Sequence, residues 1–157
     1  MPSLAEDVRV FLACRRIAVA GVSRDSRQPA NLIYRKLRAA GHDVFAINPR
    51  AERLEGDPAY PDLRSVPGGV EVVVIATSPE VTPRIAEQCP QAGVRIVWMH
   101  RAIGPGSVAP EAVRFCRERG ITVIDGACPM MFCEPVDVAH RCMRVVLGWF
   151  GRLPRCG

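Results

Sequence analysis

A glycine ends the first apolar run of the chain, and a hydroxyl side chain and two arginines follow it. That run is Ile17–Gly21, and the helical pattern that comes next begins near Pro29 or Asn31. The free N–H groups and the positive dipole end at the start of a helix favour a phosphate. The full G-x-G-x-x-G spacing is absent, so an ordinary strand-to-helix turn is the alternative. The candidate phosphate-binding residues of this segment are Gly21, Val22, Ser23, Arg24, Arg27 and Asn31.

A second candidate segment, Asn48-Pro49-Arg50, follows the apolar run Val44–Ile47. Sites that prefer an unphosphorylated ribose usually place Asp or Glu here, about 20 residues past the glycine turn. This chain has Arg50 and no acid in the segment. A guanidinium can bind two phosphate oxygens at once, which suits the 2′-phosphate of NADP or the 3′-phosphate of coenzyme A. The alternative is that Arg50 is only a solvated surface residue.

Two further segments, Thr77-Ser78-Pro79 and Trp98-Met99-His100, follow or end apolar runs. Their position at the strand ends makes them candidates for the walls of a nucleotide site. A structural role is sufficient for the first segment, because Ser78 or Thr82 could cap the next helix. His100 is the best-placed titratable group of the chain, but a lone histidine in a loop is more often structural than catalytic.

The segment Cys128–Cys133 precedes His140 and Cys142 and raises the question of a metal site. The spacings do not match paired zinc-binding patterns. The seven cysteines are irregularly spaced, and we expect buried thiols rather than disulfides or metal ligands. The sequence also lacks paired carboxylates, a nucleophile elbow and a P-loop. We therefore expect no catalytic residue and no metal site.

Five short apolar runs would carry these segments as strands: 17–21, 44–47, 72–76, 94–98 and 121–124. Three of the runs follow a glycine that ends a helical pattern, at Gly41, Gly93 and Gly120. Both alternating sets of their side chains are apolar, which is typical of strands buried on both faces. Strands that alternate with helices predict an α/β fold, a three-layer Rossmann-like doubly wound parallel sheet of about five strands.

Flanking helices are expected at both ends of this core. Ser3 and Glu6 predict a capping box for a first helix that ends near Leu12. We expect one domain over residues 1–157, with a core of about 15–131 and a C-terminal helix of about 136–150. Residues 51–69 are polar and rich in Gly and Pro, so we expect a surface connection with one short helix at most.

The apolar stripe of the C-terminal helix is expected to pack on the sheet. The alternative is a homodimer seam or a surface for an unidentified protein partner. The stripe comprises Val138, Cys142, Val145 and Trp149.

Charge and hydropathy limit the classes of partner. The formal net charge is +5, and the arginines are spread along the whole chain without a dense basic stripe, so we expect no nucleic-acid partner. No apolar run approaches the roughly 20 residues that span a bilayer. The first residues also lack the basic and apolar parts of a signal peptide. We therefore expect a cytoplasmic protein without a membrane partner.

An ordered series of short motifs resembles the small stand-alone CoA-binding domain proteins, whose fold is shared with the nucleotide-binding domain of the succinyl-CoA synthetase α subunit. The resemblance covers about residues 17–131, and it rests on the order and spacing of the motifs rather than on any one of them. The motifs are Gly21-Val22-Ser23, Asn31 with Tyr34, Ala46-Ile47-Asn48-Pro49, Gly56-Asp57, Tyr60-Pro61-Asp62-Leu63, Ser78-Pro79-Glu80-Val81-Thr82, Val97-Trp98-Met99 and Gly126-Ala127-Cys128-Pro129-Met130-Met131.

The resemblance implies that coenzyme A lies across the strand ends. Gly21, Val22 and Ser23 would contact the diphosphate. The adenosine would lie beside Asn48 and Pro49, with Arg50 near the ribose phosphate. On the other side, Thr77, Ser78 and Pro79 would wall the nucleotide, and Trp98, Met99 and His100 would lie toward the pantetheine path.

Two departures from the family pattern limit what can be carried over. Many relatives have glutamine where this chain has His100. The ligase and phosphohistidine segments of the synthetase are absent, so its activity is not implied.

We therefore expect a module that binds coenzyme A or an acyl-CoA without catalysis. One alternative is a small enzyme, either an NADP-dependent reductase or an acyl-CoA-handling protein that uses His100 or Cys128. The other is a protein-interaction or regulatory domain that senses a nucleotide.

Overall fold

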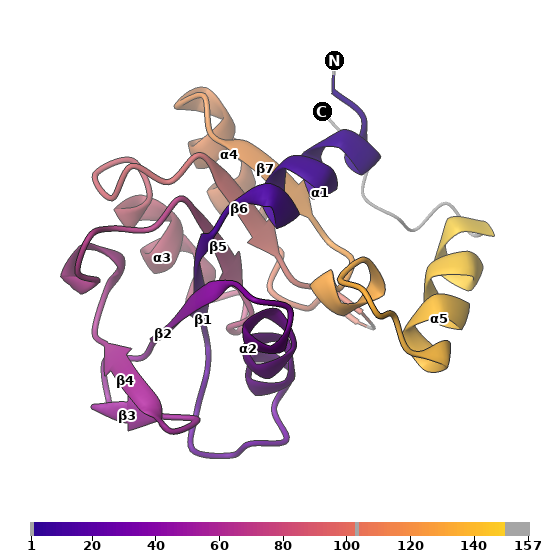
Figure 1. Cartoon of the computed structure of the whole chain (residues 1–157). Coiled ribbons are helices and arrows are strands. Elements are labelled where there is room, and N and C mark those ends of the chain that lie inside the picture. The colour runs from indigo at the N-terminus through magenta and orange to yellow at the C-terminus, as the bar shows by residue number, and fades with distance from the viewer. Residues whose placement is uncertain (1, 103, 150–157) are drawn as a thin grey trace.

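A sheet of seven strands runs through the residues that the computed structural model describes, 2–102 and 104–149 (Figure 1). The strand order is β3-β4-β2-β1-β5-β6-β7, and every pairing is parallel except that of β3 with β4. The strands are β1 Arg16–Ala20, β2 Asp43–Ile47, β3 Arg53–Leu54, β4 Asp57–Tyr60, β5 Val72–Ile75, β6 Ile96–Met99 and β7 Thr122–Asp125. The α/β class and the doubly wound parallel sheet are confirmed.

Strand β1 lies at the point where the chain order in the sheet reverses. Its last residue, Ala20, is in register with Ile47 of β2 on one side and with Ile75 of β5 on the other. The chain leaves β1 for α2 on one face of the sheet and leaves β5 for α3 on the other face, so the loops after β1 and β5 turn in opposite directions. The carboxyl edge beside β1 is therefore the expected place for a ligand in this topology.

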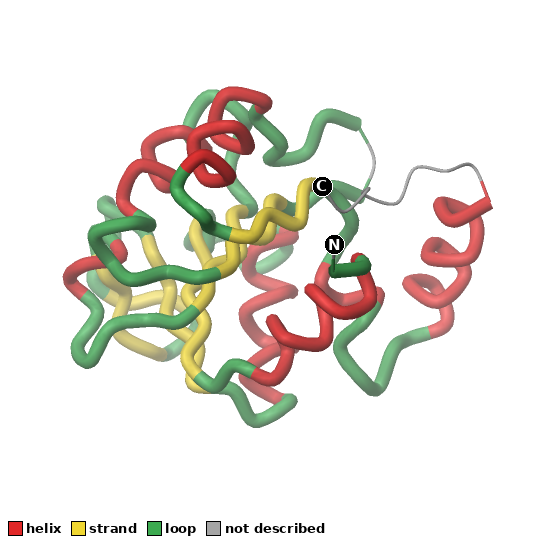
Figure 2. Tube along the Cα trace, turned by 90° about the horizontal axis from the view of Figure 1, so that it is seen from above, coloured by secondary structure: helices red, strands yellow, loops and turns green. Residues whose placement is uncertain are grey.

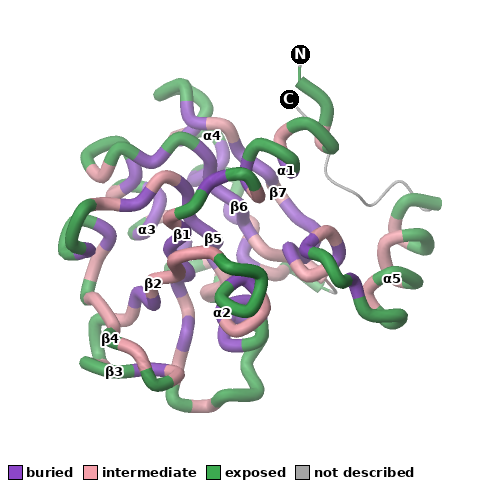
Figure 3. The backbone as a smooth tube through the Cα atoms, viewed as in Figure 1, coloured by how far each residue is buried: buried purple, intermediate pink, exposed green. Residues whose placement is uncertain are grey.

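Helices cover both faces of the sheet, as Figures 1 and 2 show. One buried cluster joins the sheet to α1 and α2, and the other joins it to α3 and α4. All four residues of β5 are buried, which explains why that run is apolar at every position (Figure 3). The helices are α1 Leu4–Ala13, α2 Pro29–Ala39, α3 Thr82–Gln88, α4 Pro110–Glu118 and α5 Val138–Trp149.

The expected starts of the first two helices are confirmed. The Ser3 hydroxyl accepts a hydrogen bond from the N–H of Glu6 at 3.3 Å, as a cap for α1. Helix α2 begins at Pro29, where the missing N–H of proline costs nothing because that position has no partner within the helix.

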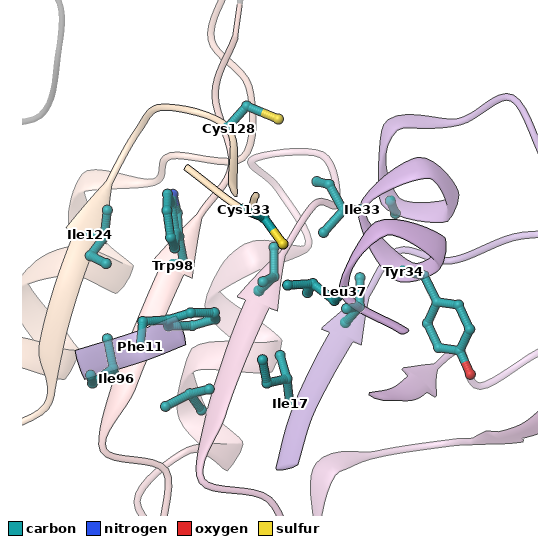
Figure 4. Packing of buried hydrophobic residues seen from close by; sticks show 14 of the residues in the cluster. Phe11, Ile17, Ile33, Tyr34, Leu37, Ile96, Trp98, Ile124, Cys128 and Cys133 are labelled. Carbon is teal, nitrogen blue, oxygen red and sulfur yellow. The ribbon is translucent and has the colours of Figure 1, made fainter. Parts of the chain in front are cut away.

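Trp98 lies in the cluster beneath α1, near Phe11 (Figure 4). Its ring meets Phe11 edge-on, with centroids 5.2 Å apart and an interplanar angle of 87°. The indole Nε1 donates to the carbonyl of Gly126 at 2.9 Å, so the polar atom of this buried ring is satisfied. Trp98 thus ties α1 to the loop after β7.

Residues 51–69 differ from the expected surface connection. They contain the antiparallel hairpin of β3 and β4, and β4 extends the sheet in parallel beside β2. The one short helix allowed for this segment is present as a 3-10 turn, η1, at Leu63–Ser65. The hairpin is short and includes Pro58, which is compatible with the edge of a sheet.

Helix α5 contacts the core with a different face from the one expected. Met143 and Leu147 pack against the cluster beneath α1, and Arg144 donates to the carbonyl of Met131 at 3.2 Å. The predicted stripe is exposed instead, with Val138 at 74% and Trp149 at 88%. The prediction that this stripe packs on the sheet is therefore wrong, and Phe150, its expected last residue, lies outside the described residues.

Buried thiols are confirmed at five of the six cysteines among the described residues. Cys142 is exposed, so the expectation of a buried thiol is wrong at that position. In the same part of the chain, the helices are all too short or too polar to cross a lipid bilayer.

Candidate functional site

The turn after β1 brings the backbone of Gly21 against the loop after β5. A Cβ at Gly21 would lie 2.5 Å from the carbonyl oxygen of Ala76 and 3.2 Å from the amide nitrogen of Thr77. The φ angle of Gly21 is +106°, which side chains rarely permit. Both observations require glycine at this position. They also place two of the predicted segments, Gly21–Ser23 and Thr77–Pro79, side by side.

Asn31, in the first turns of α2, holds the loop after β1. Its Oδ1 accepts from the N–H of Ser23 at 3.0 Å, and its Nδ2 donates to the carbonyl of Ser23 at 2.8 Å. Asn31 is fully buried. The amide of Ser23 is therefore already paired, so Asn31 positions the loop rather than reaching outward.

The Ser23 hydroxyl and two nearby arginines also make contacts within the protein. The N–H of Asp25 donates to the Ser23 hydroxyl at 3.2 Å. Arg27 pairs with the Asp25 carboxylate at 3.0 Å, and these hydrogen bonds lower the pKa of Asp25. Arg24 donates to the carbonyl of Arg50 at 3.2 Å. Arg24 therefore joins the loop after β1 to the loop after β2, whereas Arg27 is engaged by its own turn.

Asn48 is the second bridge between those loops. Its Nδ2 donates to the carbonyl of Val22 at 2.8 Å, and its Oδ1 accepts from the N–H of Arg50 at 2.8 Å. The side chain of Val22 is buried, while Pro49 and Arg50 are exposed. The two segments predicted from sequence thus form one continuous edge.

A pocket of about 760 Å³ opens beside this edge. Three of its lining residues are arginines and one is an acid, so it carries positive charge suited to phosphate. Arg53, which sequence reasoning missed, comes from β3 and donates to the carbonyl of Gly56 at 2.6 Å. The lining residues are Arg24, Asn48, Pro49, Arg50, Ala51, Glu52, Arg53, Ala59 and Pro61.

The opposite wall, after β5, is tied to the loop after β6. The Ser107 hydroxyl donates to the carbonyl of Thr77 at 2.6 Å, and Thr82 donates to the carbonyl of Ser107 at 2.8 Å. Ser107 and Thr82 are buried, whereas Ser78 is exposed and does not cap α3. Ser107 was not among the predicted residues, because no sequence signal separates it from an ordinary loop serine.

The residues of the segment Trp98-Met99-His100 lie in two environments, the first two in the hydrophobic core and the third at the carboxyl edge of the sheet. Trp98 and Met99 are fully buried, one in each hydrophobic cluster, so their side chains contact protein. Only His100 reaches beyond the strand, and burial together with nearby His140 lowers its pKa to about 4. Its imidazole is therefore neutral at pH 7.

The cysteine segment after β7 lies near the same end of the sheet. Burial raises the pKa of Cys128 to about 11, so its thiol is protonated at neutral pH. His140 is engaged by Asp137, with Nδ1 and the carboxylate oxygen 2.6 Å apart. Within the described residues no group of three or more histidine, cysteine or acidic side chains could hold a metal ion.

Comparison with known sequences identifies a family and similar proteins. The model of the CoA binding domain matches residues 15–134. The chain is 27% identical over 139 residues to the uncharacterized protein YneT of Bacillus subtilis, covering 88% of this chain and 95% of that protein. It is 29% identical over 105 residues to the acetate–CoA ligase (ADP-forming) II subunit alpha of Pyrococcus furiosus, covering 66% of this chain but 23% of that subunit.

Solved structures agree with the fold. A hypothetical protein from Pyrococcus horikoshii OT3 superimposes with a TM-score of 0.76 at 29% identity, covering 83% of this chain and 90% of that one. A Thermus thermophilus protein gives a TM-score of 0.67 at 26% identity, covering 87% and 96%. The chain thus spans nearly the whole of these small proteins but less than a quarter of the ligase subunit.

Proposed function

The chain belongs to the CoA binding domain family, and on that premise we propose that it binds coenzyme A or an acyl-CoA at the carboxyl edge of its sheet without catalysing a reaction. The diphosphate would lie against the loop Gly21–Ser23. The adenosine would lie beside Asn48 and Pro49, and Thr77–Pro79 would form the opposite wall. The pantetheine arm would run toward His100.

The pocket beside Asn48 is the observation that carries this proposal. Arg24, Arg50 and Arg53 line it, and Arg24 and Asn48 connect it directly to the loop after β1. Coenzyme A has phosphates at two places on the same ribose, the 5′-diphosphate and the 3′-phosphate. A basic pocket that adjoins a glycine turn can receive both at once.

The protonation of the nearby side chains supports binding without chemistry. The Cys128 thiol, with a pKa of about 11, carries little thiolate at neutral pH, and the thiolate is the nucleophile. His100, with a pKa of about 4, is a weak base. Neither group has a pKa near 7, where an acid–base catalyst works best.

Isothermal titration calorimetry with CoA, dephospho-CoA, NADP and NAD tests the proposed ligand. We expect CoA to bind about 10- to 100-fold more tightly than dephospho-CoA, because only CoA offers the 3′-phosphate to a charged hydrogen bond. Tighter binding of NADP or NAD than of CoA would overturn the assignment.

A second measurement tests the absence of catalysis. The protein is incubated with acetyl-CoA and a longer acyl-CoA, and free thiol is followed over time. We expect no release above the buffer rate. Release that scales with protein concentration and is lost in His100→Gln or Cys128→Ala would establish an acyl-CoA-handling enzyme instead.

A further inference from the structure

Four side chains along one face of α2 donate hydrogen bonds to the tip of the β3–β4 hairpin. They follow helical spacing, so they form a single stripe. Two acidic residues on the hairpin tip, Glu55 and Asp57, receive most of these bonds. The four donors are Asn31, Tyr34, Arg35 and Arg38.

Glu55 is the more constrained of the two acids. Its φ is +53°, an uncommon conformation for a residue with a side chain, and its side chain is 10% exposed. Its Oε1 accepts from Nδ2 of Asn31 at 2.6 Å and from Nη1 of Arg35 at 2.8 Å. Burial alone would raise the pKa of Glu55, but these hydrogen bonds outweigh it and the pKa is lowered. Glu55 is thus held as a carboxylate.

Both donors to Glu55 also hold the loop after β1. Asn31 binds the N–H and the carbonyl of Ser23, and Nη2 of Arg35 donates to the carbonyl of Ser26 at 3.0 Å. Glu55 therefore contacts both side chains that hold this loop, Asn31 and Arg35.

Asp57 anchors the same hairpin without contacting the loop. It accepts from the hydroxyl of Tyr34 at 2.7 Å and from Nη1 of Arg38 at 2.6 Å. Arg38 also donates to the backbone carbonyl of Glu55 at 2.9 Å. The fold thus contains a matched pair of anchors, one that reaches the loop and one that does not.

We propose that Glu55 is a positioning residue for the loop after β1, where the diphosphate is proposed to bind. Glu55 would act through Asn31 on Ser23 and through Arg35 on Ser26. This inference rests on the proposed function for its consequence in binding. The hairpin also places Arg53 on the wall of the pocket that Arg24 and Arg50 line, here called the arginine pocket. Glu55 therefore fixes the position of the loop after β1 relative to the hairpin that carries Arg53.

Amide hydrogen exchange at Ser23, followed by NMR without ligand, tests the positioning directly. The test variant is Glu55→Asn, because asparagine tolerates positive φ but is too short to reach Asn31 and Arg35. We expect exchange at Ser23 to rise about tenfold or more, since both hydrogen bonds to the Glu55 carboxylate are lost, while the core amide of Val74 is unchanged. Tyr34→Phe is the matched control, because it removes a hydrogen bond to Asp57 without touching Glu55, and it should leave Ser23 exchange as it is. Unchanged exchange in Glu55→Asn, or an equal rise in Tyr34→Phe, would overturn the inference.

Affinity separates this inference from the proposed function. Because the loop would hold the diphosphate, Glu55→Asn should weaken CoA and dephospho-CoA by the same factor, about tenfold. Glu55→Gln, which keeps an acceptor for Asn31, should recover part of the loss. A loss confined to CoA, or equal losses in Tyr34→Phe, would contradict the positioning role. If the unmodified protein binds neither ligand, the proposed function fails. The positioning role of Glu55 is then tested by the hydrogen-exchange measurement, which needs no ligand.

Discussion

Gly21 and Ala76 approach so closely that a Cβ on the first would lie 2.5 Å from the carbonyl oxygen of the second. These residues follow β1 and β5, the two strands between which the chain order reverses. The loops after these two strands therefore meet through backbone atoms. A side chain at this position would hold the two loops apart.

Gly21→Ala should be strongly destabilising, because the Cβ contact and the φ of +106° act together. Gly41→Ala is the matched control, since Gly41 has φ +96° but no atom within 4 Å of the added Cβ. We expect a loss of about 1 kcal/mol for Gly41→Ala from backbone strain, and at least about 2 kcal/mol more for Gly21→Ala. Urea denaturation measures both, and equal losses would show that the close contact with Ala76 relaxes freely.

Arg50→Gln should weaken CoA selectively. Arg50 is exposed beside the arginine pocket, so its removal costs little stability while a charged contact to the 3′-phosphate is lost. We expect about a 10-fold loss or more for CoA and little change for dephospho-CoA. Arg27→Gln is the control, because Arg27 pairs with Asp25 in its own turn. Equal losses for the two ligands in Arg50→Gln would remove Arg50 from 3′-phosphate recognition.

Trp98→Phe should lower stability without changing CoA affinity. The substitution removes the Nε1 hydrogen bond and leaves the buried carbonyl of Gly126 without its donor, which costs about 1–3 kcal/mol. Thermal unfolding measures the loss, and calorimetry should give a CoA dissociation constant within about twofold of the unmodified protein. A selective loss of CoA affinity would instead return Trp98 to the pantetheine path that the family resemblance implies.

Stability should fall as the pH decreases from about 6.5 to about 4, because of His100. The pKa of His100 is lowered to about 4 in the folded protein, so in this range the unfolded chain binds the proton more readily than the folded one. The unfolded state is then favoured as the pH falls, by up to roughly 3 kcal/mol at about 1.4 kcal/mol per pH unit.

His100→Gln supplies the control for this pH dependence, because glutamine does not titrate. Urea midpoints measured at pH 7, 6, 5 and 4.5 should form a flatter series in His100→Gln than in the unmodified protein. Parallel series in the two proteins would assign the pH dependence to other groups.

The central sheet could be predicted because its strands are buried on both faces. Runs such as Val72–Ile75 are apolar at every position, and a glycine marks the helix end before three of them. The carboxyl ends of parallel strands share one edge, so Gly21, Asn48 and Thr77 could be placed near one another without coordinates.

The hairpin could not be predicted from the same signals. Strand β3 has two residues and lies at the edge of the sheet, and the four residues of β4 include Asp57 and Pro58, so neither strand forms an apolar run. The contributions of Arg53 to the pocket and of Glu55 to the loop depend on this hairpin. The Gly56-Asp57 pair in the family motifs was the available signal, but it says nothing about where neighbouring side chains point.

The orientation of α5 illustrates a different limit. The helix carries apolar residues on two faces, with Met143 and Leu147 on one and Val138 and Trp149 on the other. Periodicity identifies an amphipathic helix but cannot choose between two apolar stripes. Packing against η2, the 3-10 turn Pro129–Met131, decides the choice, with Arg144 bound to its last carbonyl.

Alkylation of the buried thiols can measure local unfolding of the chain without an added label. Cys14, Cys89 and Cys116 lie at or near the ends of α1, α3 and α4, whereas Cys128 and Cys133 flank η2. An alkylating reagent added to the native protein modifies the exposed Cys142 before these five buried thiols, which it reaches only when their own segment detaches. The order in which they are alkylated therefore ranks the structural layers by how often each comes apart.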